Sequence, residues 1–96
     1  MTRKEEIKSM IRKVVAGHLS GNYSVFLFGS QVGLPELKRA DIDVGIDAKR
    51  PLTNLEESLI WTELEDMPTL YKFDLVDFQK SDDSFKNIAL KNIEMI

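Results

Sequence analysis

Cysteine is absent from the 96-residue chain, and this excludes disulfides and thiolate metal sites. Without any sign of an oxidising compartment, we expect a cytoplasmic location. Long apolar runs are absent as well. None approaches the roughly 20 residues that cross a bilayer, and the charged segment at residues 2–10 lacks the apolar core of a signal peptide. We therefore expect neither export nor membrane insertion.

A strong excess of one charge is also missing, since the chain has 13 basic and 16 acidic side chains and a formal net charge of −3. This balance argues against a dedicated nucleic-acid-coating surface, although it leaves room for a local basic patch. Hydrophobic residues make up 43% of the chain and charged residues 30%, which is typical of a globular protein. Length and composition together predict one domain over residues 1–96.

Apolar residues at helical spacing predict three helices, at residues 2–18, 53–65 and 81–95. Thr2 and Thr53 each precede a glutamate at capping-box spacing, and Ser81 is the expected N-cap of the last helix. The expected core-facing positions are Ile7, Met10, Ile11, Val14 and Val15, then Leu55, Leu59, Ile60 and Leu64, and finally Phe85, Ile88, Ala89 and Ile93.

Aromatic and β-branched runs predict three strands, at residues 23–28, 42–46 and 70–78. The connector at residues 31–40 has room for one short helical turn, whose length Pro35 limits. The fold class is therefore α+β, in the order α-β-α-β-α-β-α. We expect a small mixed sheet of about three strands with helices packed on one face.

Two aspartates stand one residue apart where the second strand begins, in the sequence "ADIDVGID". Because side chains alternate along a strand, Asp41 and Asp43 share one face, and Ile42 and Val44 point into the core. Like charges at this spacing repel, and aspartate is depleted from strands. A divalent cation would offset the repulsion, and Mg²⁺ prefers such oxygen ligands. The simpler alternative is a loop end beside a solvated strand edge.

The third strand, "LYKFDLVDF", supplies one further candidate ligand. Asp74 and Asp77 are three residues apart and face opposite sides, so only one can join the other two acids. Asp74 lies between apolar neighbours in mid-strand, which is the more anomalous placement. We therefore choose Asp74 as the third ligand and expect Asp77 to be a solvated acid near the strand end.

A Gly-Ser pair, Gly29-Ser30, ends the first strand. Its ordinary interpretation is a turn. Its functional interpretation is backbone N–H groups and a hydroxyl directed at a phosphate, with Gly29 allowing close approach. Neither a Walker A sequence nor a G-x-G-x-x-G fingerprint occurs in the chain.

Taken together, Gly29-Ser30, the Asp41-Ile42-Asp43 motif and Asp74 on a later strand resemble the nucleotidyltransferase superfamily, which includes DNA polymerase beta. The short length is similar to its minimal nucleotidyltransferase branch, whose members are often paired with a HEPN-domain protein as antitoxin and toxin. The resemblance implies a two-metal Mg²⁺ site at Asp41, Asp43 and Asp74. It also implies that the segment starting at Gly29, with Ser30 and Gln31, binds the phosphates of ATP or another nucleoside triphosphate.

The implied reaction transfers a nucleoside monophosphate, with AMP from ATP as the expected group, to a hydroxyl acceptor on a partner protein of the HEPN type.

The chain departs from the minimal branch at the segment where Gly-Ser-Arg-Ala-Arg-Gly is common, because "GSQVGL" lacks both arginines. Ala40 also replaces a common serine. Lys38 and Arg39 either compensate or form a solvated loop pair. Two functions therefore remain open: an active nucleotidyltransferase, or an antitoxin that neutralises its partner by complex formation alone. A polymerase is disfavoured by the small size and net acidity.

Overall fold

The computed structural model describes residues 2–29, 32–37 and 40–96. Three helices and four strands follow one another in the order α1 (Arg3–Ala16), β1 (Ser24–Phe28), β2 (Asp41–Asp47), α2 (Asn54–Glu65), β3 (Lys72–Asp77), α3 (Asp83–Ala89) and β4 (Ile93–Met95). The expected α+β class is confirmed. None of the helices in the described part of the chain is long and apolar enough to span a membrane.

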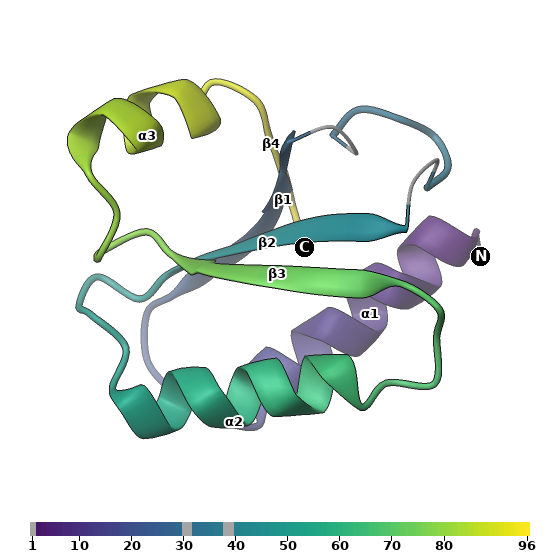
Figure 1. Cartoon of the computed structure of the whole chain (residues 1–96), viewed down its shortest axis with the longest axis horizontal. Helices are drawn as coiled ribbons and strands as arrows, with labels where there is room; N and C mark the ends of the chain where they lie inside the picture. The colour runs from purple at the N-terminus through teal and green to yellow at the C-terminus, as the bar shows by residue number, and fades with distance from the viewer. Residues whose placement is uncertain (1, 30–31, 38–39) are drawn as a thin grey trace.

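The four strands form one mixed sheet in the order β3-β2-β1-β4 (Figure 1). β2 runs parallel to β3, and β1 runs antiparallel to both β2 and β4. Phe28 at the end of β1 is paired with Asp43 of β2, which is in turn paired with Asp74 of β3. The register therefore fixes which side chains of neighbouring strands share a face.

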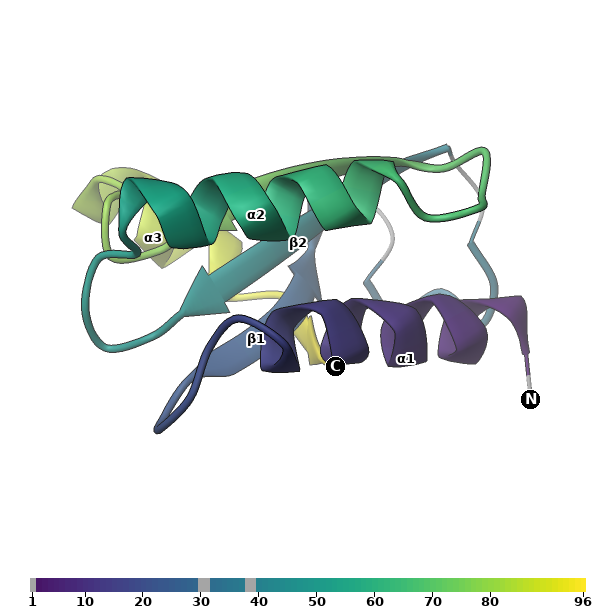
Figure 2. The ribbon, with the colours of Figure 1, turned by 90° about the horizontal axis from the view of Figure 1, so that it is seen from below.

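The helices α1 and α2 lie side by side on one face of the sheet (Figure 2). The main core fills the space between them and the sheet. It is formed by Ile7, Ile11, Val15, Leu19, Val25, Leu27, Ile42, Val44, Ile46, Leu52, Ile60, Leu64, Phe73 and Leu75. The alternation expected for β2 is confirmed, because its isoleucines and valine enter this core and its first two aspartates do not.

The third helix lies on the opposite face, so the expectation that all helices pack on one face is wrong (Figure 1). A second core of three phenylalanines, Phe26, Phe28 and Phe78, lies beneath α3. Phe78 meets Phe26 and Phe28 edge-on, with ring centroids 4.9 and 5.4 Å apart. Gly45 makes this packing possible, because a Cβ there would meet the Phe26 ring and lie 2.6 Å from Phe78.

The helix starts follow the capping rules only in part. Thr53 forms the complete capping box with Glu56, as expected, whereas Thr2 accepts from Glu5 N–H. The last helix begins one residue later than expected, because Asp82 rather than Ser81 is its N-cap. An aspartate carboxylate accepts the orphan N–H groups of a first turn as well as a serine does.

The buried face of α2 is narrower than expected. Ile60 and Leu64 are fully buried, but Leu55 and Leu59 are 68% and 42% exposed. The two leucines at the first turns therefore face away from the core.

The expected helix at residues 81–95 ends early, and its last residues form β4 instead. Ile93 pairs with Phe28 and Met95 with Phe26, so the strand extends the sheet beyond β1. Ala89 and Ile93 pack on the phenylalanine core, but Ile88 is 73% exposed. Pairing with β1 is favoured over continuation of the helix, because it forms backbone hydrogen bonds between β4 and β1 and also buries Ile93.

The connector between β1 and β2 begins with a 3₁₀ turn at Gly29, and the rest of its described part is not helical. Val32 N–H donates to the Gly29 carbonyl over 3.3 Å, and residues 32–37 and 40 are not helical. Val32 and Leu37 pack against the main core. The short helical turn expected here is therefore not found among those residues.

Candidate nucleotidyltransferase site

Three carboxylates come together on the sheet face that α1 and α2 do not cover. Asp41 and Asp43 are two residues apart on β2, and Asp74 is the strand partner of Asp43 on β3. Parallel pairing in register directs the side chains of Asp43 and Asp74 to the same side. The sequence-based prediction that these three acids share a face is confirmed by this register.

The central carboxylate, Asp43, is the one whose ionised form the arrangement disfavours. Burial raises its pKa, and the negative charges of Asp74 and Asp41 raise it further. Each effect disfavours the ionised form. A cation at this position would oppose both charge effects and restore the ionised carboxylate.

Gly29 lies directly against Asp43. Its φ of +80° is in the left-handed region, which non-glycine residues rarely adopt. A Cβ at this position would lie 2.5 Å from the Asp43 Oδ2 atom. Only glycine therefore lets the end of β1 approach the carboxylate so closely. The predicted close approach of a phosphate to Gly29 stays a prediction.

The donor chemistry fits Mg²⁺, because all three side chains offer carboxylate oxygens on one surface. Within residues 2–29, 32–37 and 40–96, however, no three acidic or histidine side chains stand in an arrangement that could hold a metal ion. Asp41, Asp43 and Asp74 would therefore have to draw together on binding.

The profile of the family described as "Polymerase beta, Nucleotidyltransferase" matches residues 10–96 of the sequence. The chain belongs to this family. The match includes Asp41, Asp43, Asp74 and the turn at Gly29. No curated protein matches the sequence.

Solved structures agree with the nucleotidyltransferase fold. A Shewanella oneidensis crystal structure superposes with a TM-score of 0.76 at 17% identity, over 97% of this chain and 71% of that chain. A structure described as tri-AMPylated Shewanella oneidensis HEPN toxin in complex with MNT antitoxin gives 0.75 at 17% identity, over 96% and 70%. A mutant toxin–antitoxin complex, MntA–HpeT, gives 0.72 at 19% identity, over 93% and 69%.

Part of the predicted phosphate-binding segment of this nucleotidyltransferase chain lies outside the described residues. Ser30 and Gln31 lie outside the described residues, and so do Lys38 and Arg39 of the same connector. The predicted roles of Ser30 and Gln31 therefore stay predictions. Gly29 is the one member of the segment whose position against the acids is established.

Asp77 is not the solvated acid that the sequence suggested. Its side chain is 4% exposed, and it faces the α2 side of the sheet, opposite Asp74. Its two carboxylate oxygens accept from Leu52 N–H at 2.8 Å and from Gln79 N–H at 2.9 Å. Asp77 thus fastens the segment before α2 to the end of β3, and its role is structural.

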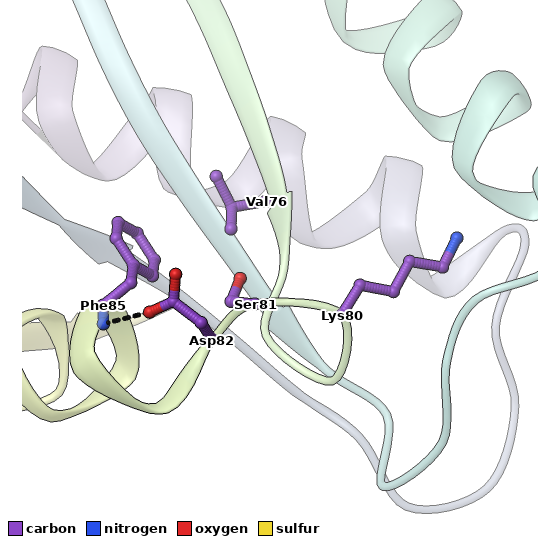
Figure 3. A pocket seen from close by; sticks show the side chains of 5 residues that line it. All are labelled: Val76, Lys80, Ser81, Asp82 and Phe85. Atoms are coloured by element: carbon purple, nitrogen blue, oxygen red, sulfur yellow. Dashed lines mark hydrogen bonds between the residues drawn. The ribbon is translucent and has the colours of Figure 1, made fainter.

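A hollow beside α3 lies on the same side of the sheet as the acids, and Figure 3 shows its lining residues, Val76, Lys80, Ser81, Asp82 and Phe85. Its polar groups already have structural partners. Asp82 accepts from Phe85 N–H at 2.8 Å, and the Ser81 hydroxyl donates to the Asp77 carbonyl at 3.1 Å. Lys80 extends away from the other four to a glutamate of α2. These groups hold the start of α3 in place.

Glu94 is an acid that the sequence did not single out, because it was expected in a helix. In β4 its carboxylate receives hydrogen bonds from Lys4 at 2.7 Å and from Gly33 N–H at 3.0 Å, and it also pairs with Lys8. The alternation of "NIEMI" is the one sequence signal that could have found it, since a lone acid between the apolar residues Ile93 and Met95 is typical of a strand.

Proposed function

We propose that this protein is a Mg²⁺-dependent nucleotidyltransferase that moves AMP from ATP to a hydroxyl of a partner protein in the cytoplasm. The observation that supports it most is the contact between the end of β1 and the acidic face. Gly29 lies against Asp43, and Asp43 lies between the charges of Asp41 and Asp74. A phosphate-binding turn beside three carboxylates is the arrangement that this transfer requires.

In this proposal Asp41, Asp43 and Asp74 hold two Mg²⁺ ions. The bound ions lower the pKa of the acceptor hydroxyl and neutralise the pyrophosphate leaving group. Asp74 helps to orient and activate that hydroxyl, whose proton passes to a carboxylate oxygen of Asp74 as the hydroxyl oxygen attacks. A bond forms between the acceptor oxygen and the α-phosphorus, and the bond from that phosphorus to the pyrophosphate oxygen breaks.

The segment beginning at Gly29, with Ser30 and Gln31, holds the β- and γ-phosphates. The backbone at Gly29 can approach them closely because no side chain intervenes. Fixing the triphosphate and the acceptor in line supplies much of the rate enhancement in such a reaction. The absence of arginine from "GSQVGL" leaves backbone donors and Ser30 as the chief phosphate ligands.

The proposed partner and acceptor is a HEPN-domain protein. Support comes from the two toxin–antitoxin structures with the same fold, one of which is described as containing a tri-AMPylated HEPN toxin. A domain of this size has little surface for a separate acceptor pocket. The acceptor hydroxyl would therefore be presented by the partner.

The test is a transfer experiment with labelled ATP, Mg²⁺ and the product of the adjacent gene. We expect label on the partner, and we expect it to disappear with Asp41→Asn. Asp83→Asn is the matched control, because Asp83 is an exposed acid in the first turn of α3. Equal labelling by the wild type and by Asp41→Asn would contradict the proposal.

A second candidate function is a binding module that neutralises the partner without chemistry. Its support is the altered segment "GSQVGL", which lacks both arginines that are common in the minimal branch. Loss of these cations would weaken the binding of phosphate groups. A tight complex that Asp41→Asn leaves intact, with no label transfer by the wild type, would favour this alternative.

A further inference from the structure

Three segments that are distant in sequence meet at Glu94 of β4. Lys4 and Lys8 come from α1, and Gly33 and Leu34 come from the β1–β2 connector. Lys4 is shared, because its ammonium group donates to Glu94 at 2.7 Å and to the Leu34 carbonyl at 2.5 Å. The connector is therefore held at two consecutive residues, once through its N–H and once through its carbonyl.

This cluster differs from an ordinary surface ion pair. The Lys4 side chain is 4% exposed, so its charge is nearly out of water and depends on these oxygens. Burial acts to raise the pKa of Glu94, but hydrogen bonds from Lys4, Lys8 and Gly33 outweigh it and lower the pKa to about 2. Glu94 is therefore ionised across the physiological pH range and keeps all of its donors.

The held connector has both of its ends in the candidate site. It starts at Gly29, which lies against Asp43, and it leads into Asp41 at the beginning of β2. Gly33 adopts a φ of +78°, and this unusual backbone turns its N–H toward the Glu94 carboxylate. Gly33 stands four positions after Gly29 in the chain, so the held part of the connector is close in sequence to the turn beside Asp43.

We propose that Glu94 is a positioning residue for the nucleotide site, acting through Lys4 and Gly33 to hold the β1–β2 connector in its phosphate-binding conformation. This role rests on the proposed function. Glu94 itself faces α1, on the side of the sheet away from the three aspartates, so it does not touch the nucleotide. Its effect is on affinity and on the order of the connector.

The matched control is Glu56→Gln. Glu56 is also an ion-paired glutamate with a pKa lowered to about 2, in its case by hydrogen bonds from Arg50 and Thr53. It lies at the start of α2, which follows the end of β2, whereas Asp41 lies at the beginning of β2. The same substitution thus removes a comparable charge far from the connector.

The experiment measures the Kd for Mg²⁺–ATP and the amide hydrogen exchange of the connector in the wild type, Glu94→Gln, Lys4→Met and Glu56→Gln. We expect Glu94→Gln and Lys4→Met to weaken binding by about tenfold, as loss of a supporting hydrogen bond does at metal sites. We expect faster exchange at residues 32–37 in the same two variants. Glu56→Gln should leave both quantities as in the wild type, even if it lowers Tm.

Each outcome decides a different question. Unchanged affinity in folded Glu94→Gln and Lys4→Met, with binding by the wild type, would overturn the positioning role alone. Equal weakening by Glu56→Gln would also overturn it, because a general loss of stability would then suffice. Failure of the wild type to bind Mg²⁺–ATP would overturn the proposed function and the positioning role with it. If Glu94→Gln does not fold, Lys4→Met carries the comparison.

Discussion

The α3 side of the sheet is divided into two halves that use the same strands in opposite ways. In one half, Gly45 of β2 lies beneath the rings of Phe26 and Phe78, and α3 covers them. In the other half, two residues earlier on the same strand, Asp43 lies against Gly29 and beside Asp74. Each half needs a glycine, one to admit rings and one to admit a carboxylate.

The phenylalanine half stabilises the fold, whereas the acidic half destabilises it. The phenylalanine half gains from edge-on ring contacts and from apolar burial. The acidic half gathers charges of one sign, and burial together with Asp74 and Asp41 raises the pKa of Asp43. A cost of this kind persists at sites where the folded protein binds something.

Among substitutions in the phenylalanine half, we expect Phe78→Ala to destabilise the fold most. Phe78 is 2% exposed, and its loss should lower the free energy of unfolding by about 3–5 kcal/mol because it leaves a cavity. Phe85→Ala, which truncates a ring at the edge of the same cluster, should cost clearly less. Chemical denaturation measures both. A loss below about 1 kcal/mol for Phe78→Ala would show that this half is not a true core.

Glu94 provides a contrasting carboxylate, because Lys4 and Lys8 neutralise its charge, whereas no ion pair to Asp43 occurs among residues 2–29, 32–37 and 40–96. Its pKa is lowered from 4.5 to about 2, so its contribution to stability is complete above the unfolded value and is lost as the pH falls from about 4.5 to about 2. Glu94→Gln should cost about 2 kcal/mol at neutral pH, typical of hydrogen bonds to a charged group.

The measurement is the free energy of unfolding as a function of pH. The wild type should lose stability steeply in this acidic window, and Glu94→Gln should lose less. Parallel curves for the two proteins would contradict the assigned pairing of Glu94.

The glycine of the acidic half is tested by Gly29→Ala. The alanine would be strained at a φ of +80°, at a cost of about 1–2 kcal/mol, and its Cβ would lie 2.5 Å from the Asp43 Oδ2 atom. We expect the displaced carboxylate to weaken Mg²⁺–ATP binding as well. Gly21→Ala is the matched control, because Gly21 has the same φ of +80° but no atom within 4 Å of the added Cβ.

Isothermal titration and thermal unfolding of both alanine variants separate backbone strain from the effect on Asp43. Gly21→Ala should lower Tm and leave nucleotide affinity unchanged. Equal affinities for all three proteins would remove Gly29 from the proposed site.

The smallest expected effect is a gain in stability from Asp43→Asn. Because the folded state holds a proton on Asp43 more tightly than the unfolded chain does, the wild type loses stability as the pH rises through the raised pKa. Removing one of two paired like charges should therefore stabilise the metal-free protein, by about 0.5 kcal/mol at neutral pH.

The same variant should lose nucleotidyl transfer by about 100-fold or more, since it removes a proposed metal ligand. Thermal unfolding without divalent cations, together with the transfer assay, measures both changes. A lower Tm for Asp43→Asn would contradict the assignment of an electrostatic cost to this half.

Much of the acidic half could be predicted from the sequence because strand alternation is a local rule. The spacing of Asp41 and Asp43 fixed their common face, and the apolar neighbours of Asp74 marked it as anomalous. The capping box at Thr53 was also predictable, since its two partners are three residues apart.

What could not be predicted depends on pairing between distant segments. β4 was missed because three residues after a short helix continue an apolar pattern, and only β1 decides that they form a strand. Asp77 was misjudged because one of its two donors, the Leu52 N–H, is 25 positions away in the sequence and meets it only in the folded chain. Leu55 and Leu59 follow the helical apolar spacing but are 68% and 42% exposed, which the spacing alone does not show.

The contact between Lys4 and Glu94 also has a consequence for the order of folding. It joins residues 90 positions apart, and β4 pairs with β1 near the other end of the chain. Contacts of such long sequence separation form slowly, because the intervening chain must first lose its freedom. During synthesis the β1–β2 connector therefore has to wait for Glu94 to leave the ribosome.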